Sequence, residues 1–222
     1  MDTLSLMKAR HSVRQYTDRK IEGEILEKLK AQLASAEEKS GLGFELILNE
    51  PCAFDCMLAK KVGFKNAVNY IAVIGKKTFE NEMKAGYFGT EIVLFAQGIG
   101  LNNCFVCGTY NRKKVKCELQ KGEKILCIIT VGYGETPGTA HINCSIDKLC
   151  DFRGDMPPWF MRGMDYAMLA PTALNKQKFC FILRNGNEVK LTDRGGTCKG
   201  ITLGIVKYHF EAGAGKENFK FV

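Results

Sequence analysis

The sequence predicts an α+β protein in which a mixed central sheet is flanked by helices. Some segments have apolar residues at helical spacing. Between them lie short runs of β-branched and aromatic residues, and glycine, proline or asparagine marks the ends of these runs. Helices and strands come in groups instead of alternating strictly, which is typical of α+β folds. The chain has 222 residues, 45% of them hydrophobic, so it is long enough to bury a core without disulfides.

The first half of the chain reveals its elements through spacing and end signals. Ile25, Leu29 and Leu33 share one helical face, and Gly41 ends that helix. Residues 124–131 are apolar throughout, which favours a central strand covered on both faces. In chain order we predict helices at 4–10, 23–39, 78–97 and 111–119, and strands at 44–48, 69–74, 104–107 and 124–131.

The second half begins with residues 139–157, which carry no clear period and which we call the connecting arm. Pro157-Pro158 then opens a helix, because proline suits the first helical turn. Asn185-Gly186 is a hairpin-turn signal between two strand-like runs. We predict helices at 157–169 and 201–212, and strands at 178–183, 188–192 and 218–222.

The order of elements also indicates a degenerate repeat, 1–150 and 151–222, within a single domain of residues 1–222. In each half a helix leads into a similar strand, and a later helix carries an Ile-Val pair, Ile92-Val93 or Ile205-Val206. The matched residues are few and common, so chance remains the alternative. A real repeat would place two half-folds about a pseudo-two-fold axis.

Composition and charge narrow the functional classes. The net charge is +8, and its excess of Lys and Arg fits either a solvated surface or attraction of an anionic ligand such as a phosphate-bearing cofactor. No basic recognition helix is present, so we expect no nucleic-acid partner. No apolar run reaches the ~20 residues of a membrane span, and the first residues lack a signal-peptide pattern. We therefore expect a cytoplasmic protein with no membrane partner.

Ten cysteines are present, and in a cytoplasmic protein we expect them to be reduced. Cys104 and Cys107 form one Cys-x-x-Cys, but a structural zinc site usually needs a second such pair. We therefore expect no metal site and keep a Cys-rich metal-binding module only as an alternative.

Arg10-His-Ser-Val-Arg14, the N-terminal motif, is the first segment that could carry chemistry. Two guanidinium forks four residues apart, with Ser12 between them, suit capture of a phosphate. The alternative is a basic helix end that is stabilised by the helix dipole.

Ala170-Pro-Thr-Ala-Leu-Asn-Lys-Gln177, the carboxamide turn, is the second such segment. Thr172, Asn175 and Gln177 place a hydroxyl and two carboxamides at a helix-to-strand junction. Carboxamides both donate and accept, so they can recognise the edge of a heteroaromatic ring. A local cap and turn is the alternative.

Gly108-Thr109 follows a predicted strand and forms the third candidate. Glycine lets backbone N–H groups approach a ligand closely, and one amide there could donate to a ring nitrogen.

Together these segments resemble the nitroreductase family of FMN-dependent flavoproteins. That family has an early Arg-x-Ser-x-Arg motif and an Ala-Pro-Ser/Thr-x-x-Asn-x-Gln motif, and both occur here. Residues 86–101 and the strand that ends at Tyr133-Gly134 also resemble the family's long helix and later strand. In typical members the Asn-x-Gln motif follows soon after the first motif, whereas here it lies some 160 residues later. This arrangement resembles a divergent branch with a pseudo-duplicated chain.

The resemblance implies that FMN is bound and that NAD(P)H reduces it. Its phosphate and ribityl region would contact Arg10, His11, Ser12 and Arg14, the flavin N5 would lie near the backbone of Gly108 or Thr109, and the ribityl chain and ring edge would contact Thr172, Asn175 and Gln177. The flavin itself would carry the hydride, so no side chain is expected to be catalytic.

The implied reaction is ping-pong, from NAD(P)H to a nitroaromatic, quinone or similar small-molecule electron acceptor. A catalytically degenerate flavin-binding protein is the alternative function. The resemblance leaves two oligomeric states open, a monomer that acts as a pseudo-dimer or a homodimer.

Overall fold

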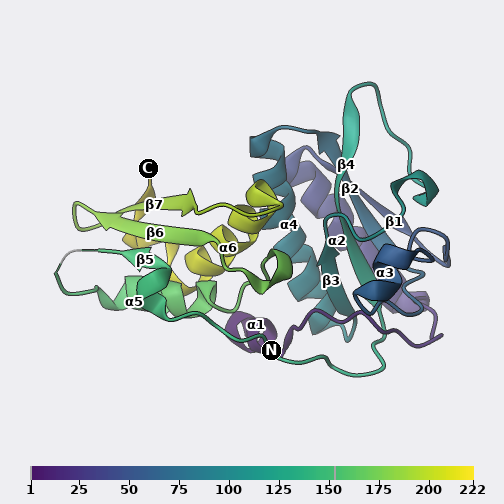
Figure 1. The fold of residues 1–222 in the computed structure, drawn as a ribbon, viewed down its shortest axis with the longest axis horizontal. Coiled ribbons are helices and arrows are strands. Elements are labelled where there is room, and N and C mark those ends of the chain that lie inside the picture. The colour runs from purple at the N-terminus through teal and green to yellow at the C-terminus, as the bar shows by residue number, and fades with distance from the viewer. Residues whose placement is uncertain (1, 153) are drawn as a thin grey trace.

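The computed structural model describes residues 2–152 and 154–222, and it confirms the α+β class. Its strands form two sheets instead of one mixed central sheet (Figure 1). The first has the order β1-β2-β4-β3 and is antiparallel, and the second has the order β5-β6-β7-β8 and is mixed. The strands of the first sheet are β1 (Gly43–Ile47), β2 (Tyr70–Lys76), β3 (Asn102–Val106) and β4 (Glu123–Gly132).

Strand β4 is central to the first sheet, as its apolar sequence predicts. It pairs with β2 on one side and β3 on the other, and Ile129 lies opposite Ile71 and Phe105. Ile128 faces one buried cluster while Ile129 faces another, so the strand is covered on both faces.

The second sheet is formed by β5 (Cys150–Asp151), β6 (Phe179–Arg184), β7 (Glu188–Asp193) and β8 (Lys220–Phe221). Asn185 and Gly186 both have positive φ angles, 47° and 80°, and they turn β6 into β7 as the sequence predicts.

Six α-helices lie in the described part of the chain: α1 (Thr3–Ala9), α2 (Gly23–Ser40), α3 (Met57–Lys61), α4 (Phe79–Gly98), α5 (Pro158–Ala167) and α6 (Lys199–Ala214). The helix predicted at 111–119 is wrong, because only the short 3-10 turn Arg112–Lys114 forms there. Val115 and Cys117 instead pack against a buried cluster beneath the first sheet. None of the described helices is both long and apolar enough to cross a bilayer.

Helices α4 and α6 pack together where the two sheets meet (Figure 1). A Cβ added to Gly86 of α4 would overlap the carbonyl oxygen of Ile201, and one added to Gly204 of α6 would overlap that of Met83. The two helices therefore touch backbone to backbone. One hydrophobic cluster continues from α2 and the first sheet through this crossing to Phe181 in the second sheet.

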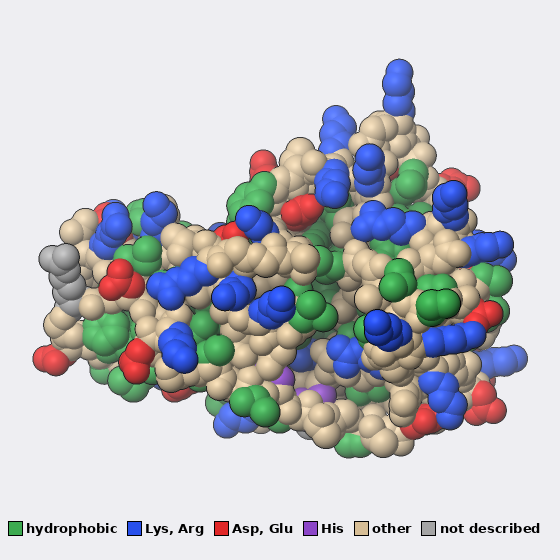
Figure 2. All heavy atoms as spheres, in the orientation of Figure 1, with side chains coloured by type: hydrophobic (Ala, Val, Ile, Leu, Met, Phe, Trp, Pro, Cys, Tyr) green, Lys and Arg blue, Asp and Glu red, His purple; other side chains and the backbone are tan. Residues whose placement is uncertain are grey.

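The N-terminal motif runs beside β3 after α1 ends. Ser12 forms a parallel bridge with Asn103, and the amide of Val13 donates to the carbonyl of Asn103 at 3.1 Å. This pairing carries residues 10–14 to the edge of the first sheet, where they run alongside β3 from its start. On the face shown in Figure 2, Lys and Arg side chains are scattered over the whole surface and do not gather in one patch.

Candidate functional site

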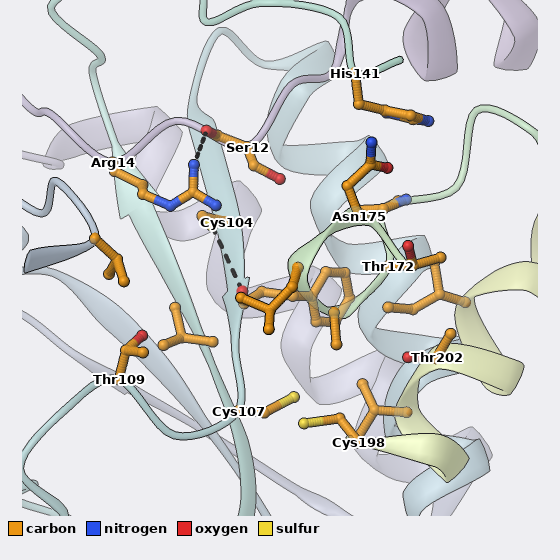
Figure 3. A pocket seen from close by; sticks show the side chains of 18 of the residues that line it. Ser12, Arg14, Cys104, Cys107, Thr109, His141, Thr172, Asn175, Cys198 and Thr202 are labelled. Atoms are coloured by element: carbon orange, nitrogen blue, oxygen red, sulfur yellow. Dashed lines mark hydrogen bonds between the residues drawn. The ribbon is translucent and has the colours of Figure 1, made fainter. Parts of the chain in front are cut away.

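A cavity of about 590 Å³ lies between the N-terminal motif, the end of β3, the carboxamide turn and the start of α6. Its volume falls within the roughly 300–1,000 Å³ of small-molecule and cofactor sites. Eight of the nine residues that the sequence predicts for the site line it, namely Arg10, His11, Ser12, Arg14, Gly108, Thr109, Thr172 and Asn175. Figure 3 shows Ser12, Arg14, Thr109, Thr172 and Asn175 among them.

Arg10 marks the cationic end of the cavity. Its side chain is 2% exposed, and its Nε and Nη1 atoms make no hydrogen bond within the described residues. Burial lowers the pKa of Arg10 to about 10. Burying a guanidinium without a partner is costly, so an anion at this end of the cavity would be favoured.

The rest of the N-terminal motif is extended, not helical. Helix α1 ends at Ala9, so the alternative of a basic last helical turn is not what forms here. The Val13 amide donates to the His11 carbonyl at 3.0 Å, and Val13 packs into a buried cluster while Arg10, His11, Ser12 and Arg14 line the cavity. Arg14 is exposed, and its Nη1 donates to the carbonyl of Ser12 at 3.3 Å (Figure 3).

The charge of Arg10 acts on two histidines, His11 and His209. Burial, with repulsion from Arg10 and from His141, lowers the pKa of His11. Burial lowers the pKa of His209 to about 3, with Arg10 and His141 adding to the shift. The Nδ1 of His209 donates to the carbonyl of Ile205 at 2.9 Å, while its Nε2 has no partner among the described residues. The positive charge at this end therefore comes chiefly from arginine.

The carboxamide turn supplies polar groups on the opposite side. Leu174 and Asn175 have φ angles of 54° and 52°, an uncommon conformation that asparagine tolerates better than leucine does. Asn175 Nδ2 donates to the carbonyl of Ile142 in the connecting arm at 2.9 Å. The Thr172 hydroxyl oxygen accepts from the amide of Gln177 at 3.1 Å, which leaves its proton free to donate.

Gln177 is not among the residues that line this cavity, and its predicted contact with a ligand stays a prediction. Its Nε2 donates to Ile142 at 2.9 Å and to Asn175 Oδ1 at 3.2 Å, and its Oε1 accepts from the amide of Cys144 at 3.0 Å. The Gln177 carboxamide thus uses its hydrogen bonds to hold the connecting arm against the turn, and it positions Asn175.

Gly108 follows β3 on the cavity wall. A Cβ at this position would meet no atom within 4 Å, and its φ angle is not in the left-handed region. The fold itself therefore does not need glycine here. Its small size leaves the backbone open to a ligand at this point of the wall.

Sequence reasoning missed the apolar wall and the start of α6. The Gly195-Gly196 pair indicates a loop before α6, but it does not reveal that the start of this helix faces the cavity. The missed lining residues include Val62, Phe64, Cys104, Phe105, Val106, Cys107, His141, Cys198, Ile201, Thr202 and Ile205. The cavity is therefore cationic at one end and apolar along its wall.

Within residues 2–152 and 154–222, no group of three or more His, Cys, Asp or Glu side chains is arranged to hold a metal ion. The alternative of a Cys-rich metal-binding module therefore finds no support in the described residues.

Comparisons with known proteins agree on one family. Residues 2–214 match the family model described as "Putative TM nitroreductase". A Thermotoga maritima crystal structure of the same designation has a TM-score of 0.65 and 19% identity, covering 96% of this chain and 83% of that chain. No curated protein matches the chain significantly.

Two further structures of this designation were crystallised with FMN. The Desulfovibrio desulfuricans protein has a TM-score of 0.54 and 16% identity over 71% of this chain and 99% of its own. The Exiguobacterium sibiricum protein has a TM-score of 0.53 and 15% identity over 67% of this chain and 95% of its own. These likenesses show the fold, and the family match over nearly the whole chain shows that the protein belongs to this nitroreductase family.

Proposed function

We propose that the protein is an FMN-dependent oxidoreductase that passes reducing equivalents from NAD(P)H to a nitroaromatic, quinone or similar acceptor in the cytoplasm. The observation that carries this proposal is a cofactor-sized cavity that Arg10 and Arg14 line at one end, where the Nε and Nη1 of Arg10 are buried without a partner among the described residues. A phosphate there would compensate the guanidinium, since arginine binds phosphate oxygens in bidentate fashion. Family membership and the two FMN complexes support the same cofactor.

The residues of the cavity fit the parts of FMN. Arg10, His11, Ser12 and Arg14 would hold the phosphate and the nearby ribityl oxygens. Thr172 has a hydroxyl proton free for a ribityl oxygen, and Asn175 Oδ1 keeps accepting capacity beyond its bond from Gln177. Backbone amides of Gly108 and Thr109 would face the ring, because nothing crowds Gly108.

Bound FMN would supply the hydride chemistry, and the protein would supply binding, orientation and exclusion of water. Phe105, Val106 and Ile201 present apolar surface along the wall, which suits a planar ring. Leu174 also lines the cavity yet is 75% exposed, so it offers an apolar contact at the edge for an aromatic acceptor.

We further propose that the chain works as a monomer, a pseudo-dimer of the halves 1–150 and 151–222. The support is that both halves line this cavity and that α4 and α6 cross through paired glycines. A homodimer is the alternative, and sedimentation of the purified protein distinguishes the two.

The visible spectrum of the protein as purified tests the proposal. Flavin absorption that NADH or NADPH bleaches, and that a nitroaromatic or quinone restores, is the expected result. Flavin that neither nucleotide bleaches would support the alternative of a degenerate flavin-binding protein. Colourless protein that takes up no FMN on incubation would rule out both functions.

A further inference from the structure

Two cysteines face each other at the cavity wall opposite the carboxamide turn. Cys107 follows the end of β3, and Cys198 is the residue before α6. Figure 3 shows their sulfur atoms pointing toward one another, and both residues line the cavity. Each is half-buried, so the sulfurs are reachable from the cavity without being fully solvated.

The surroundings differentiate the two thiols. A hydrogen bond from the Cys107 thiol, opposed by burial, lowers the pKa of Cys198 below the usual thiol range. The same bond, together with burial, raises the pKa of Cys107. Cys198 also lies at the N-terminus of the 16-residue α6, where the helix dipole favours a thiolate.

The backbone at Cys198 directs its side chain into the cavity. Its φ angle is 57°, the left-handed conformation that few non-glycine residues adopt. Gly195 and Gly196, with φ angles of 91° and 118°, precede it and give this loop freedom to shift.

We propose that Cys107 and Cys198 are a redox-active thiol pair that reduces small disulfides entering the cavity. This inference goes beyond the flavin reaction and concerns the protein whose cavity holds no flavin. The Cys198 thiolate attacks one sulfur of the incoming disulfide, the disulfide bond breaks, and the first small thiolate leaves and takes up a proton from solvent. Cys107 then loses its proton and attacks the Cys198 sulfur, which releases the second small thiol. The pair ends as a disulfide after giving two electrons to the substrate.

In the test, the flavin-free full chain is reduced, freed of reductant and exposed to oxidised glutathione. Acid quenching, alkylation and peptide mass spectrometry then identify the products. The expected product is one Cys107–Cys198 disulfide per chain with release of two glutathione molecules, reversed by dithiothreitol. Cys107→Ser should stop at a mixed disulfide on Cys198 and release one glutathione. Cys198→Ser should slow reaction at Cys107 by about tenfold or more, because the favoured thiolate is lost.

Cys56→Ser is the matched control, because Cys56 is also half-buried but lies outside the cavity, and it should behave like the wild type. Cys107 and Cys198 left unlinked in the wild type would overturn the proposal. So would faster reaction at the exposed Cys52 than at Cys198. Alkylation rates of the unmutated protein at neutral pH give an independent check, and Cys198 should be modified faster than Cys52.

Discussion

Gln177 donates a hydrogen bond to Asn175 Oδ1 at 3.2 Å, and both side chains donate to the carbonyl oxygen of Ile142 at 2.9 Å. Only Asn175 of the two reaches the large cavity. The pair therefore links the connecting arm to the cavity wall, with Gln177 as the anchor and Asn175 as the exposed contact.

Replacing Gln177 with Ala should loosen the connecting arm. The change removes three hydrogen bonds and leaves the Cys144 amide without its acceptor, so we expect a loss of about 1–3 kcal/mol in unfolding free energy. Hydrogen exchange should speed up at the Cys144 amide. Lys176→Ala, at the exposed neighbouring position, is the control and should leave that amide protected. Equal protection in both variants would contradict the anchoring role.

Replacing Arg10 with Met should have opposite effects on stability and on binding. Without a bound anion, Met fills a similar space and removes a buried unpaired charge, so unfolding free energy should rise by about 1–3 kcal/mol. FMN affinity should fall by about tenfold or more, because the guanidinium that would pair with the phosphate is lost. Urea unfolding and FMN titration measure the two effects. An unchanged FMN affinity would show that Arg10 does not meet the phosphate.

Replacing Gly86 with Ala should disrupt the crossing of α4 and α6. Its methyl group would overlap the Ile201 carbonyl, and the backbone can make room only by shifting a helix, which costs about 1–3 kcal/mol. Gly98→Ala is the matched control, because Gly98 is an exposed position at the end of the same helix. A Cβ there meets only Leu6 at 3.7 Å, so that variant should gain up to about 1 kcal/mol. Thermal unfolding of both variants tests the contrast.

Replacing His209 with Gln should flatten the pH dependence of stability. The folded-state pKa of His209 lies at about 3, whereas an unfolded histidine titrates near its ordinary value of 6.5. Between these two values the unfolded chain binds a proton that the folded chain does not, so stability falls as the pH falls through this window. At pH 5 the loss from this group is about 2 kcal/mol.

Urea unfolding of wild type and His209→Gln at about pH 7 and pH 5 measures this difference. His11 also has a lowered pKa and contributes a loss of the same sign in both proteins. An identical drop between the two pH values in both proteins would show that His209 is not responsible.

Spacing predicted those parts of the fold that a single segment determines. The helix expected at 23–39 spans Gly23–Ser40, because its apolar stripe and Gly41 define it locally. The helix expected at 111–119 fails for the converse reason. Its basic residues favour a helix but provide no apolar stripe, and the Asn111 amide instead donates to the Ala53 carbonyl at 2.8 Å.

Only those cavity residues that belong to a sequence motif could be predicted. Arg10–Arg14 and Asn175 could be identified from residue type and spacing. Cys198 and Ile201 could not, because their place in the wall depends on the helix crossing at Gly86, a contact between distant segments. Gln177 illustrates a third limit, since two carboxamides two residues apart do not reveal which one faces the cavity.

The walls of one cavity come from residues 10–14 and from residues 197–205, so both ends of the polypeptide must be present before it can enclose anything. A nascent chain that has left the ribosome only as far as β7 holds the guanidinium groups of the first motif but lacks the start of α6. Because α6 also crosses α4 at Gly204 and contributes to the shared core, the cavity can close only after residue 205 has been synthesised.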